Sequence, residues 1–458
     1  MNAPLIQNAE PALAQATVGA PYSPGYTRYA MWLLLGIYIA NFLDRQIITI
    51  LAEPIKQELG LADWHLGLLS GLAFAMFYTI LGIPIARIAE RRNRPVIIAA
   101  SVAVWSAFTA LGGLAQNFTQ LVLFRVGVGV GEAGCTPPAH SLIADYVPRE
   151  KRASALAFYA MGTPIGTLLG LALGGLVADA YGWRVAFLIA GAPGLVFAVL
   201  AFTTLREPRR QMAKHAAHLA ANAATFGETM AYLARRRTFW LVSVGGAIKA
   251  FIAFGAGPFT ASFFLRNHSV EVAALAAQAS EFAGFQMKSI GFLGLALGLV
   301  SGLSGALGAL CGGWLSDRLG ARDLRAWMLA PAGASLLSIP VFILAVTTPQ
   351  ASVALCLMAL NGFMGTLWFG PVYGTAQSVV PPHMRATAAA VLLFIVNLLG
   401  FGLGPITVGA MSDIFNYGFG LGPAEGVRWA LVVGSLFGVG AFGCFWAARK
   451  TIREETLN

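Results

Sequence analysis

Twelve long apolar segments, separated by shorter polar ones, make up most of this chain. A helix needs about 20 apolar residues to cross the hydrocarbon core of a bilayer, because each residue adds about 1.5 Å. The pattern therefore predicts twelve membrane-spanning helices, six on each side of a polar stretch. We place them at 29–51, 66–87, 95–116, 118–145, 153–178 and 184–205, and then at 239–265, 290–315, 327–347, 351–378, 386–411 and 428–448.

The same pattern divides the chain into two bundles of an all-α membrane protein. The parts are an N-terminal tail (1–28), a first bundle (29–205), a linker (206–237), a second bundle (238–448) and a C-terminal tail (449–458). The linker mixes basic residues with alanines, so it forms either a short helix on the membrane surface or a plain connection. The first tail lacks the apolar core of a secretory signal, and we expect the first helix to direct insertion.

Composition and charge support this topology. The chain is 57% hydrophobic and only 11% charged, which is less than half of the charged share of about 25% in soluble domains. The net charge of +10 does not indicate a nucleic-acid partner, because the basic residues form short clusters between apolar runs. Most of them fall on the side of the two termini, which predicts that this side is cytoplasmic. We expect a multi-pass protein of the cell (inner) membrane.

The sequence carries no signature of an enzyme or a metal site. The four cysteines lie singly inside apolar segments, and the six histidines form no ligand pair within a predicted helix. There is no Gly-x-Ser-x-Gly motif either. We therefore expect no enzymatic activity, no disulfide, no metal and no other cofactor.

Short motifs recur in the two bundles in the same order and at nearly the same spacing. Such recurrence indicates that six helices were duplicated, and it favours a carrier over a channel. Glycines also recur at every fourth position in the fifth and eighth predicted helices, which predicts either close helix packing or a smooth face on which the bundles slide. The matches are Ala86–Arg91 with Gly313–Arg318, Pro148–Ala155 with Pro381–Ala388, and Gly175-x-x-x-Asp179 with Gly409-x-x-x-Asp413; the glycines are Gly162, Gly166, Gly170 and Gly174, and Gly294, Gly298 and Gly302.

At these motifs the chain resembles the major facilitator superfamily. Gly313–Arg322 is similar to the family signature Gly-x-Leu-Ala-Asp-Arg-x-Gly-Arg-Arg, and the run from Arg125 to Glu132 is similar to its helix 4 pattern. More narrowly, Asn41–Arg45 and the loop from Glu90 resemble the Spinster branch. The resemblance implies two pseudo-symmetric bundles around a central cavity. It also implies a proton-linked, alternating-access exporter of lysophospholipids or sphingosine phosphates.

Five charged residues lie inside predicted membrane helices: Asp44, Arg45, Arg125, Glu132 and Lys249. Charges at this depth are costly, so those that persist usually face a cavity or each other. Asp44 and Arg125 lie at the same predicted depth on neighbouring helices, and we expect them to pair. Glu132 lies two turns along from Arg125, near the middle of the membrane.

The roles of these charges follow from their chemistry. We predict that Asp44 and Glu132 carry protons, because a buried carboxyl changes its protonation when a neighbouring arginine moves. A static ion network between the helices is the alternative. Arg45, Arg125 and Lys249 are the candidates for binding a substrate head group.

A second group of charged residues lies at the cytoplasmic ends of the helices. The resemblance implies that such residues latch a cytoplasmic gate, and the alternative is that they fix topology and cap helices. For Asp145 we expect a partner in Arg149 or Arg152. The gate candidates are Glu90, Arg91, Asp145, Arg152, Asp317, Arg318 and Arg385.

The second bundle is richer in aromatic residues than in charges, which favours a substrate with an apolar tail. An amphiphilic lipid with its head group on the basic residues fits this asymmetry, and a small organic anion or drug is the alternative. We expect a monomer whose partners are this substrate, protons and the lipid bilayer. The candidates for the tail site are Phe251, Phe254, Phe363, Trp368 and Tyr373.

Overall fold

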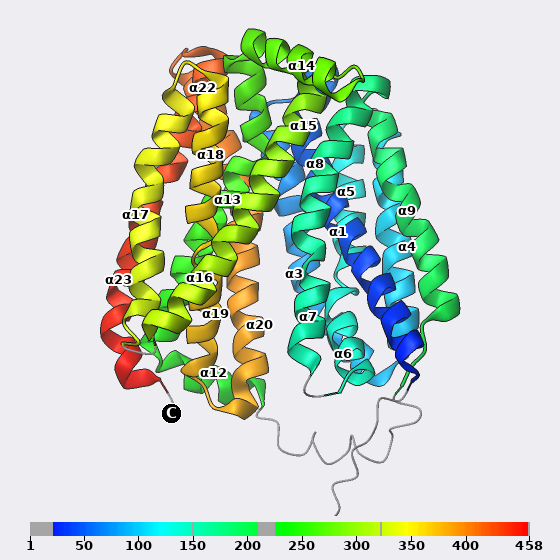
Figure 1. The fold of residues 1–458 in the computed structure, drawn as a ribbon, viewed down its shortest axis with the longest axis vertical. Coiled ribbons are helices and arrows are strands. Elements are labelled where there is room, and N and C mark those ends of the chain that lie inside the picture. Colours follow the sequence, from blue (N-terminus) through cyan, green and yellow to red (C-terminus); the bar gives the residue numbers. More distant parts are fainter. Residues whose placement is uncertain (1–21, 149–150, 209–224, 321–322, 457–458) are drawn as a thin grey trace, which may run out of the picture.

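The computed structural model describes residues 22–148, 151–208, 225–320 and 323–456. Within these ranges the chain folds into long helices that run along the longest axis of the molecule, and no β-strand occurs (Figure 1). Eleven helical stretches of the described residues are long and apolar enough to cross a membrane. The all-α membrane fold predicted from the sequence is therefore confirmed.

The first half of the molecule comprises nine helical segments. Several of the predicted membrane helices are divided by a short irregularity, so their pieces carry separate labels. The segments are α1 (Pro24–Leu59), α2 (Asp63–Ser70), α3 (Leu72–Arg91), α4 (Arg94–Gly112), α5 (Phe118–Glu132), α6 (Thr136–Tyr146), α7 (Arg152–Ala160), α8 (Gly162–Tyr181) and α9 (Trp183–Thr204).

The predicted helix at 118–145 is broken directly after Glu132. The helix α5 ends at Glu132, and α6 begins at Thr136. Pro137 and Pro138 lack the N–H groups that would continue the hydrogen-bond ladder, so the helix restarts instead of running through. Neither piece alone is long enough to cross a membrane, so this predicted helix is not among the eleven.

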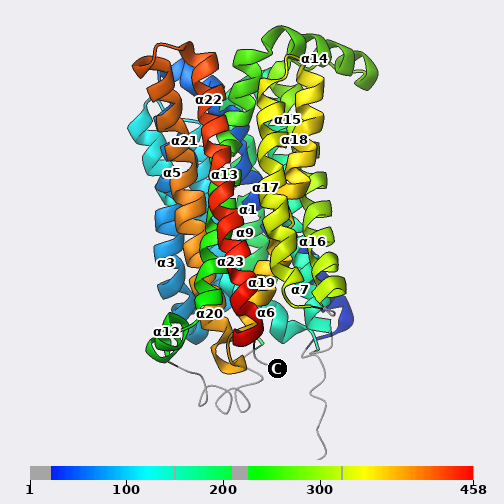
Figure 2. The same cartoon turned by 90° about the vertical axis from the view of Figure 1, so that its left-hand side faces the viewer.

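The second half repeats this arrangement and adds a helix, α14, that lies across one end of the bundle (Figure 2). Two of its long helices contain π-helical turns at η2 and η4, and a third turn, η5, follows α21. The segments are α12 (Phe226–Ala234), α13 (Arg237–Asn267), α14 (Ser269–Ala283), α15 (Ser289–Leu299), η2 (Val300–Ser304), α16 (Gly305–Gly320), α17 (Ala326–Thr347), α18 (Ala351–Thr366), α19 (Phe369–Ser378), η3 (Pro382–Met384), α20 (Arg385–Ile395), η4 (Val396–Gly402), α21 (Leu403–Asp413), η5 (Ile414–Gly418), α22 (Gly422–Leu436) and α23 (Gly438–Glu455).

The ends of the chain are more helical than the sequence predicted. The helix α1 begins at Pro24, inside the predicted tail 1–28, because Ser23 caps it and the Tyr26 hydroxyl donates to the carbonyl of Thr204 at 3.0 Å. The helix α23 likewise continues to Glu455. Residues 1–21 of the tail and 209–224 of the linker lie outside the described residues, and α12 follows them within the predicted linker.

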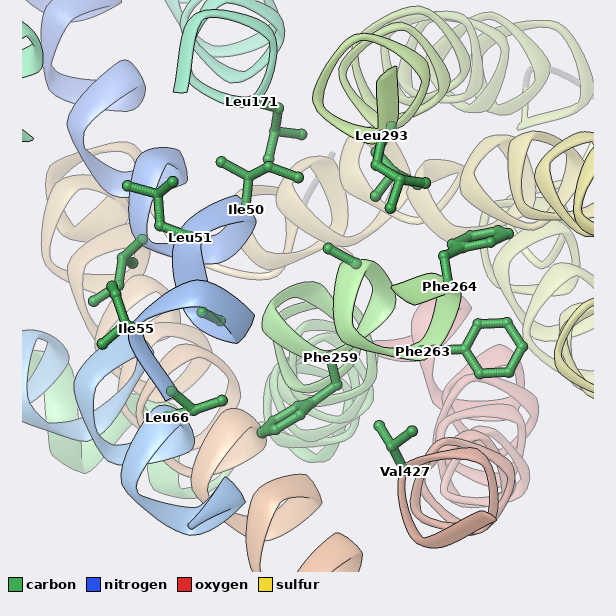
Figure 3. Close-up of a cluster of buried hydrophobic side chains, with 14 of the residues drawn as sticks. Ile50, Leu51, Ile55, Leu66, Leu171, Phe259, Phe263, Phe264, Leu293 and Val427 are labelled. Atoms are coloured by element: carbon green, nitrogen blue, oxygen red, sulfur yellow. The ribbon is translucent and has the colours of Figure 1, made fainter. Parts of the chain in front are cut away.

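The two halves share a hydrophobic core at one end of the molecule. We call the end that holds α12, the start of α1 and the end of α23 the basic end, and the opposite end, where α14 lies, the far end (Figure 1). A hydrophobic cluster at the far end contains side chains of both halves (Figure 3). Two further clusters lie toward the basic end, and the buried residues of each come from a single half. The halves are therefore joined by a common core at the far end.

Glycines allow the backbones of the two halves to touch along this seam. A Cβ atom added to Gly294 of α15 would lie 2.3 Å from the carbonyl oxygen of Leu171 in α8, and one added to Gly67 of α2 would lie 2.3 Å from that of Pro405 in α21. Real Cβ contacts are never this short, so these positions require glycine. The predicted glycine stripe on α8 does not face the second half at every position. Gly166 and Gly170 pack on α1, within the first half. Close packing, not sliding, explains that part of the stripe.

Candidate functional site

Four charged residues form ion pairs between α1 and α5 in the first half. Asp44 and Arg45 are neighbours on α1, and Arg125 and Glu132 lie two turns apart on α5. Arg125 Nη1 lies 3.8 Å from Asp44 Oδ1, so the predicted pair is present. Arg45 Nε donates to Glu132 Oε2 at 2.6 Å, a second pair that the sequence did not indicate. Each helix therefore supplies one acid and one base.

The first pair is buried but only partly hydrogen-bonded. The exposed fractions of Asp44, Arg125 and Glu132 are 2%, 3% and 0%. The Thr109 hydroxyl donates to the second oxygen of Asp44, and Arg125 Nε donates to the carbonyl of Leu69 at 3.4 Å. Both terminal nitrogens of Arg125 lack a hydrogen-bond partner in the described part of the chain. A buried charge pair with unused donors is not a fully satisfied structural bridge and can rearrange.

An aromatic ring connects the two arginines. The guanidinium carbons of Arg45 and Arg125 lie 4.9 Å and 5.4 Å from the ring centre of Phe74 in α3. Phe401 of η4 in the second half packs edge-on against Phe74, with ring centres 5.4 Å apart, and against Phe254 at 4.8 Å. The charge network of the first half is therefore in contact with η4 of the second half through Phe74 and Phe401.

A cavity of about 310 Å³ lies between the two halves beside this network. Arg45 and Lys249 are its charged lining residues, and the lining contains no aspartate or glutamate. Lys249 belongs to α13 and is 4% exposed. The cavity also presents hydroxyl and amide groups, which can orient a ligand. The polar lining residues are Gln46, Thr49, Ser70, Thr167, Thr260, Ser301, Ser304, Ser338, Asn361, Thr366 and Ser435.

Of the five aromatic residues predicted to bind a tail, Phe254 lines the cavity. Phe251 packs instead on Phe437, with ring centres 5.1 Å apart. Trp368 and Tyr373 both stack with Phe369, and the carbonyl of Phe363 closes against Gly308 of α16. The aromatic richness of the second half thus serves helix packing more than it lines the cavity.

Among the described side chains, no ion pair joins the predicted gate residues at the basic end across the two halves. The side chains of Glu90 and Arg91 lie outside the described residues. Asp317, Arg318 and Arg385 are exposed, and Arg152 is half-buried. The positions are those of helix ends, as predicted, but the pairs that a closed gate would need are not formed among the described residues.

Among the described residues Asp145 pairs with Arg94 and not with Arg152, and Arg149, the other expected partner, lies outside them. The Asp145 carboxylate lies 2.7 Å from Arg94 Nη1, and Arg94 is fully buried at the start of α4. Arg94 also bonds Ser141 at 2.8 Å and the carboxylate of Glu207, which follows α9. This cluster ties together three segments of the first half, so it holds that half and does not connect the two.

Charged residues that the sequence analysis assigned to loops close the far end. Arg266 of α13 lies 2.7 Å from Glu53 of α1 and 2.8 Å from Asp63 of α2. Lys56 Nζ lies 2.6 Å from Asp63, and the Ser412 hydroxyl donates to Asp63 at 2.6 Å. Four of these residues are buried or nearly so, and they bridge the two halves.

The repeated Gly-x-x-x-Asp motif has a matching structural role in both halves. Asp413, at the end of α21, accepts hydrogen bonds from the backbone N–H groups of Asp63 at 3.1 Å and Trp64 at 2.8 Å. Asp179, near the end of α8, accepts them from Lys288 and Gly291, both at 2.7 Å. Each aspartate thus caps the first turn of a helix in the opposite half. The repeat in the sequence was the available signal for this seal.

Comparison with known proteins identifies the family. The family model for the Major Facilitator Superfamily matches residues 34–405. The chain belongs to this superfamily. It is 31% identical to an MFS-type efflux pump of Mycolicibacterium smegmatis, over 97% of this chain and 98% of that protein. It is 28% identical to protein spinster homolog 1 of Homo sapiens, over 85% and 74% of the two chains.

A solved structure also resembles this transporter. It is a bacterial homolog of the human lysosomal transporter Spinster in an inward-facing and unoccupied conformation, with a TM-score of 0.82, 32% identity, and coverage of 95% of this chain and 100% of that chain. These relatives are transporters, so the protein is a membrane transporter of the Spinster-like type and not an enzyme.

Proposed function

We propose that the protein is a proton-coupled secondary transporter that works by alternating access and exports single-chain amphiphilic lipids, such as lysophospholipids or sphingoid phosphates. The crossed acid–base pairs of α1 and α5, buried beside a cation-lined cavity, carry this proposal. The lipid class is what the resemblance of Asn41–Arg45 and of the loop from Glu90 to the Spinster branch implies.

The chemistry of coupling follows from burial. A carboxylate away from water is stable while an arginine neutralises it, and it takes up a proton when that arginine moves away. Arg45 faces both Glu132 and the cavity, so a substrate that draws Arg45 away leaves Glu132 without its partner. Asp44 and Arg125 act in the same way through their looser contact. Protonation then changes the preference for one side being open.

The orientation is part of the proposal. We propose that the basic end faces the cytoplasm, with both termini there, in the inner membrane of the cell; the excess of lysine and arginine at this end supports the orientation. The ion pairs and the shared core at the far end then correspond to a closed outer side. This arrangement fits an inward-facing state, as in the related solved structure.

Flux measurements in proteoliposomes test the proposal. Lysophospholipids and sphingoid phosphates should accumulate under an imposed pH gradient, and Glu132→Gln and Asp44→Asn should lose that accumulation. Exchange of substrate across the membrane should persist in both variants, because it needs no net proton movement. Full proton coupling in both variants would contradict the mechanism.

A proton-driven transporter of drugs or small organic anions is the second candidate. It is favoured by the size of the cavity, which lies at the lower end of the range of about 300–1,000 Å³ for small-molecule sites. The relative from Mycolicibacterium smegmatis is an efflux pump. Competition between water-soluble anions and lipids in the same flux assay separates the two candidates.

A further inference from the structure

The central cavity has one positive charge more than its surroundings balance. Arg45 is neutralised by Glu132 at 2.6 Å, and Arg125 faces Asp44 at 3.8 Å. These four residues sum to zero. Lys249 is the charge left over.

The described residues around Lys249 offer its side chain no partner. Within the described part of the chain no carboxylate lies within 4 Å of its ammonium group, and no side chain accepts a hydrogen bond from it. Its neighbours at helical spacing along α13 also line the cavity, so Lys249 belongs to the cavity face of the helix and not to a helix interface. These neighbours are Ile252, Ala253, Ala256 and Thr260.

An ammonium group that faces a cavity inside the membrane without a counter-charge is costly and is rarely retained for stability. A ligand that supplies the missing negative charge removes this cost when it binds. A lysine also suits a ligand that turns, because its three donors surround a single point charge and impose no fixed plane. The location and the missing counter-charge therefore both point to an anion.

We propose that Lys249 is the anion anchor of the central cavity, and that the transported ligand carries a phosphate or carboxylate group which binds there. This assignment takes the cavity to be the transport site, and so it rests on the function proposed above. Arg45 supplies a second cation from the opposite half. A ligand anion in this cavity thus contacts both halves, α1 on one side and α13 on the other.

Binding of a matched pair of ligands tests the anchor. Lysophosphatidate and monoacylglycerol with the same acyl chain differ only in the phosphate, and their affinities for the purified full-length protein are measured at one pH with no gradient. The wild type should bind the phosphate form about tenfold more tightly or better, since a hydrogen bond to a charged group contributes at least this factor. Lys249→Met should bring the ratio close to one, whereas Lys249→Arg should keep most of it.

Lys288→Met is the matched control, because Lys288 is exposed in the connection between α14 and α15. It should leave the ratio unchanged. An unchanged ratio in Lys249→Met, or no preference for the phosphate form in the wild type, would overturn the assignment. The preference of the wild type for the phosphate form is measured without any variant. If the Lys249→Met protein does not fold, Lys249→Gln replaces it.

Competition by a phosphate compound without an acyl chain shows whether the anion belongs to a lipid or to a small molecule. If the natural ligand is a lipid, glycerol phosphate should compete poorly with lysophosphatidate. If it is a small organic anion, glycerol phosphate should bind as tightly as lysophosphatidate. In both cases the binding should depend on Lys249. Because no proton gradient is present, a failure here is distinguishable from a failure of coupling. Lost coupling in Asp44→Asn with an intact phosphate preference would leave the anchor in place.

Discussion

Arg94 shows how a single buried charge organises one half of the molecule. It is fully buried, and its guanidinium bonds Ser141 and Asp145 of α6 and Glu207, which follows α9. Removing one partner of a buried ion pair leaves the other charge buried without a counter-charge. This lowers the folding stability by more than the intact pair contributes.

We therefore expect Arg94→Met to lower the free energy of unfolding by about 3 kcal/mol. Thermal or denaturant unfolding of the purified protein measures this loss. Arg318→Met is the control and should have little effect, because Arg318 is exposed at the same end of the molecule. Equal stability of the two variants would show that the Arg94 cluster is dispensable.

Phe401 is the residue through which the second half touches the charge network. Its ring meets Phe74, which lies over both arginines. Phe401→Leu should weaken proton-driven transport about threefold to tenfold relative to substrate exchange, since an aromatic pair contributes about 0.5–1.5 kcal/mol beyond its buried area.

The ratio of driven flux to exchange is the measurement for Phe401. Phe437→Leu makes the same substitution at a ring that packs on Phe251, away from the arginines, and should leave the ratio unaltered. If both variants change the ratio alike, the contact with Phe74 has no special part in coupling.

At the scale of helices, the far-end seal is built from reciprocal caps. Asp413 caps α2, and Asp179 caps α15, each from the other half. The double variant Asp413→Ala/Asp179→Ala should expose the cavity to the outside about tenfold more, because each cap stabilises its helix start by about 0.5–2 kcal/mol. The labelling rate of a cysteine at Thr49 by an impermeant maleimide reports this exposure.

Asparagine caps helices about as well as aspartate, so Asp413→Asn is a close control. It should label much more slowly than the alanine variant. Rapid labelling of the asparagine variant would assign the effect to lost charge and not to lost capping.

The glycines of the seam predict a second way to open the far end. Gly294→Ala places a Cβ atom 2.3 Å from the carbonyl of Leu171, so α8 and α15 must move apart, at a cost of about 1–3 kcal/mol. Gly313→Ala meets nothing within 4 Å and should be neutral. The same cysteine labelling compares the two, and equal rates would contradict a tight seam.

The helices themselves were largely predictable, because an apolar run of sufficient length has one stable state in a bilayer. The break between α5 and α6 was not predicted, although Pro137 and Pro138 signal it. The far-end seal was missed for a physical reason. Asp63 and Arg266 lie at helix ends, where charge is inexpensive, so their sequence positions gave no sign that they pair.

The intramembrane charges were found because charge is costly there, but the cost identifies residues and not their partners. The pairing of Asp44 with Arg125 followed from the equal depth of the two residues in the membrane. Arg45 with Glu132 did not, since neighbouring residues on a helix point in different directions and the facing one depends on helix rotation. The rotation is set by packing of all the helices, which a single sequence does not state.

At the scale of the whole molecule, the proposed orientation makes a direct prediction. A cysteine at Phe282 of α14, which is almost fully exposed, should react with an impermeant reagent from outside intact cells, and one at Gly227 of α12 only after the cells are opened. The native cysteines are replaced by serine beforehand. The opposite pattern would reverse the assignment of the basic end to the cytoplasm.

The reciprocal caps also bear on how the protein is made. The chain emerges in order, so α2 is inserted long before Asp413 exists to accept its N–H groups. The first bundle therefore waits for almost the whole of the second before its far end is complete. The bundles are interdependent in biogenesis, and either one synthesised alone would leave a helix start without its cap.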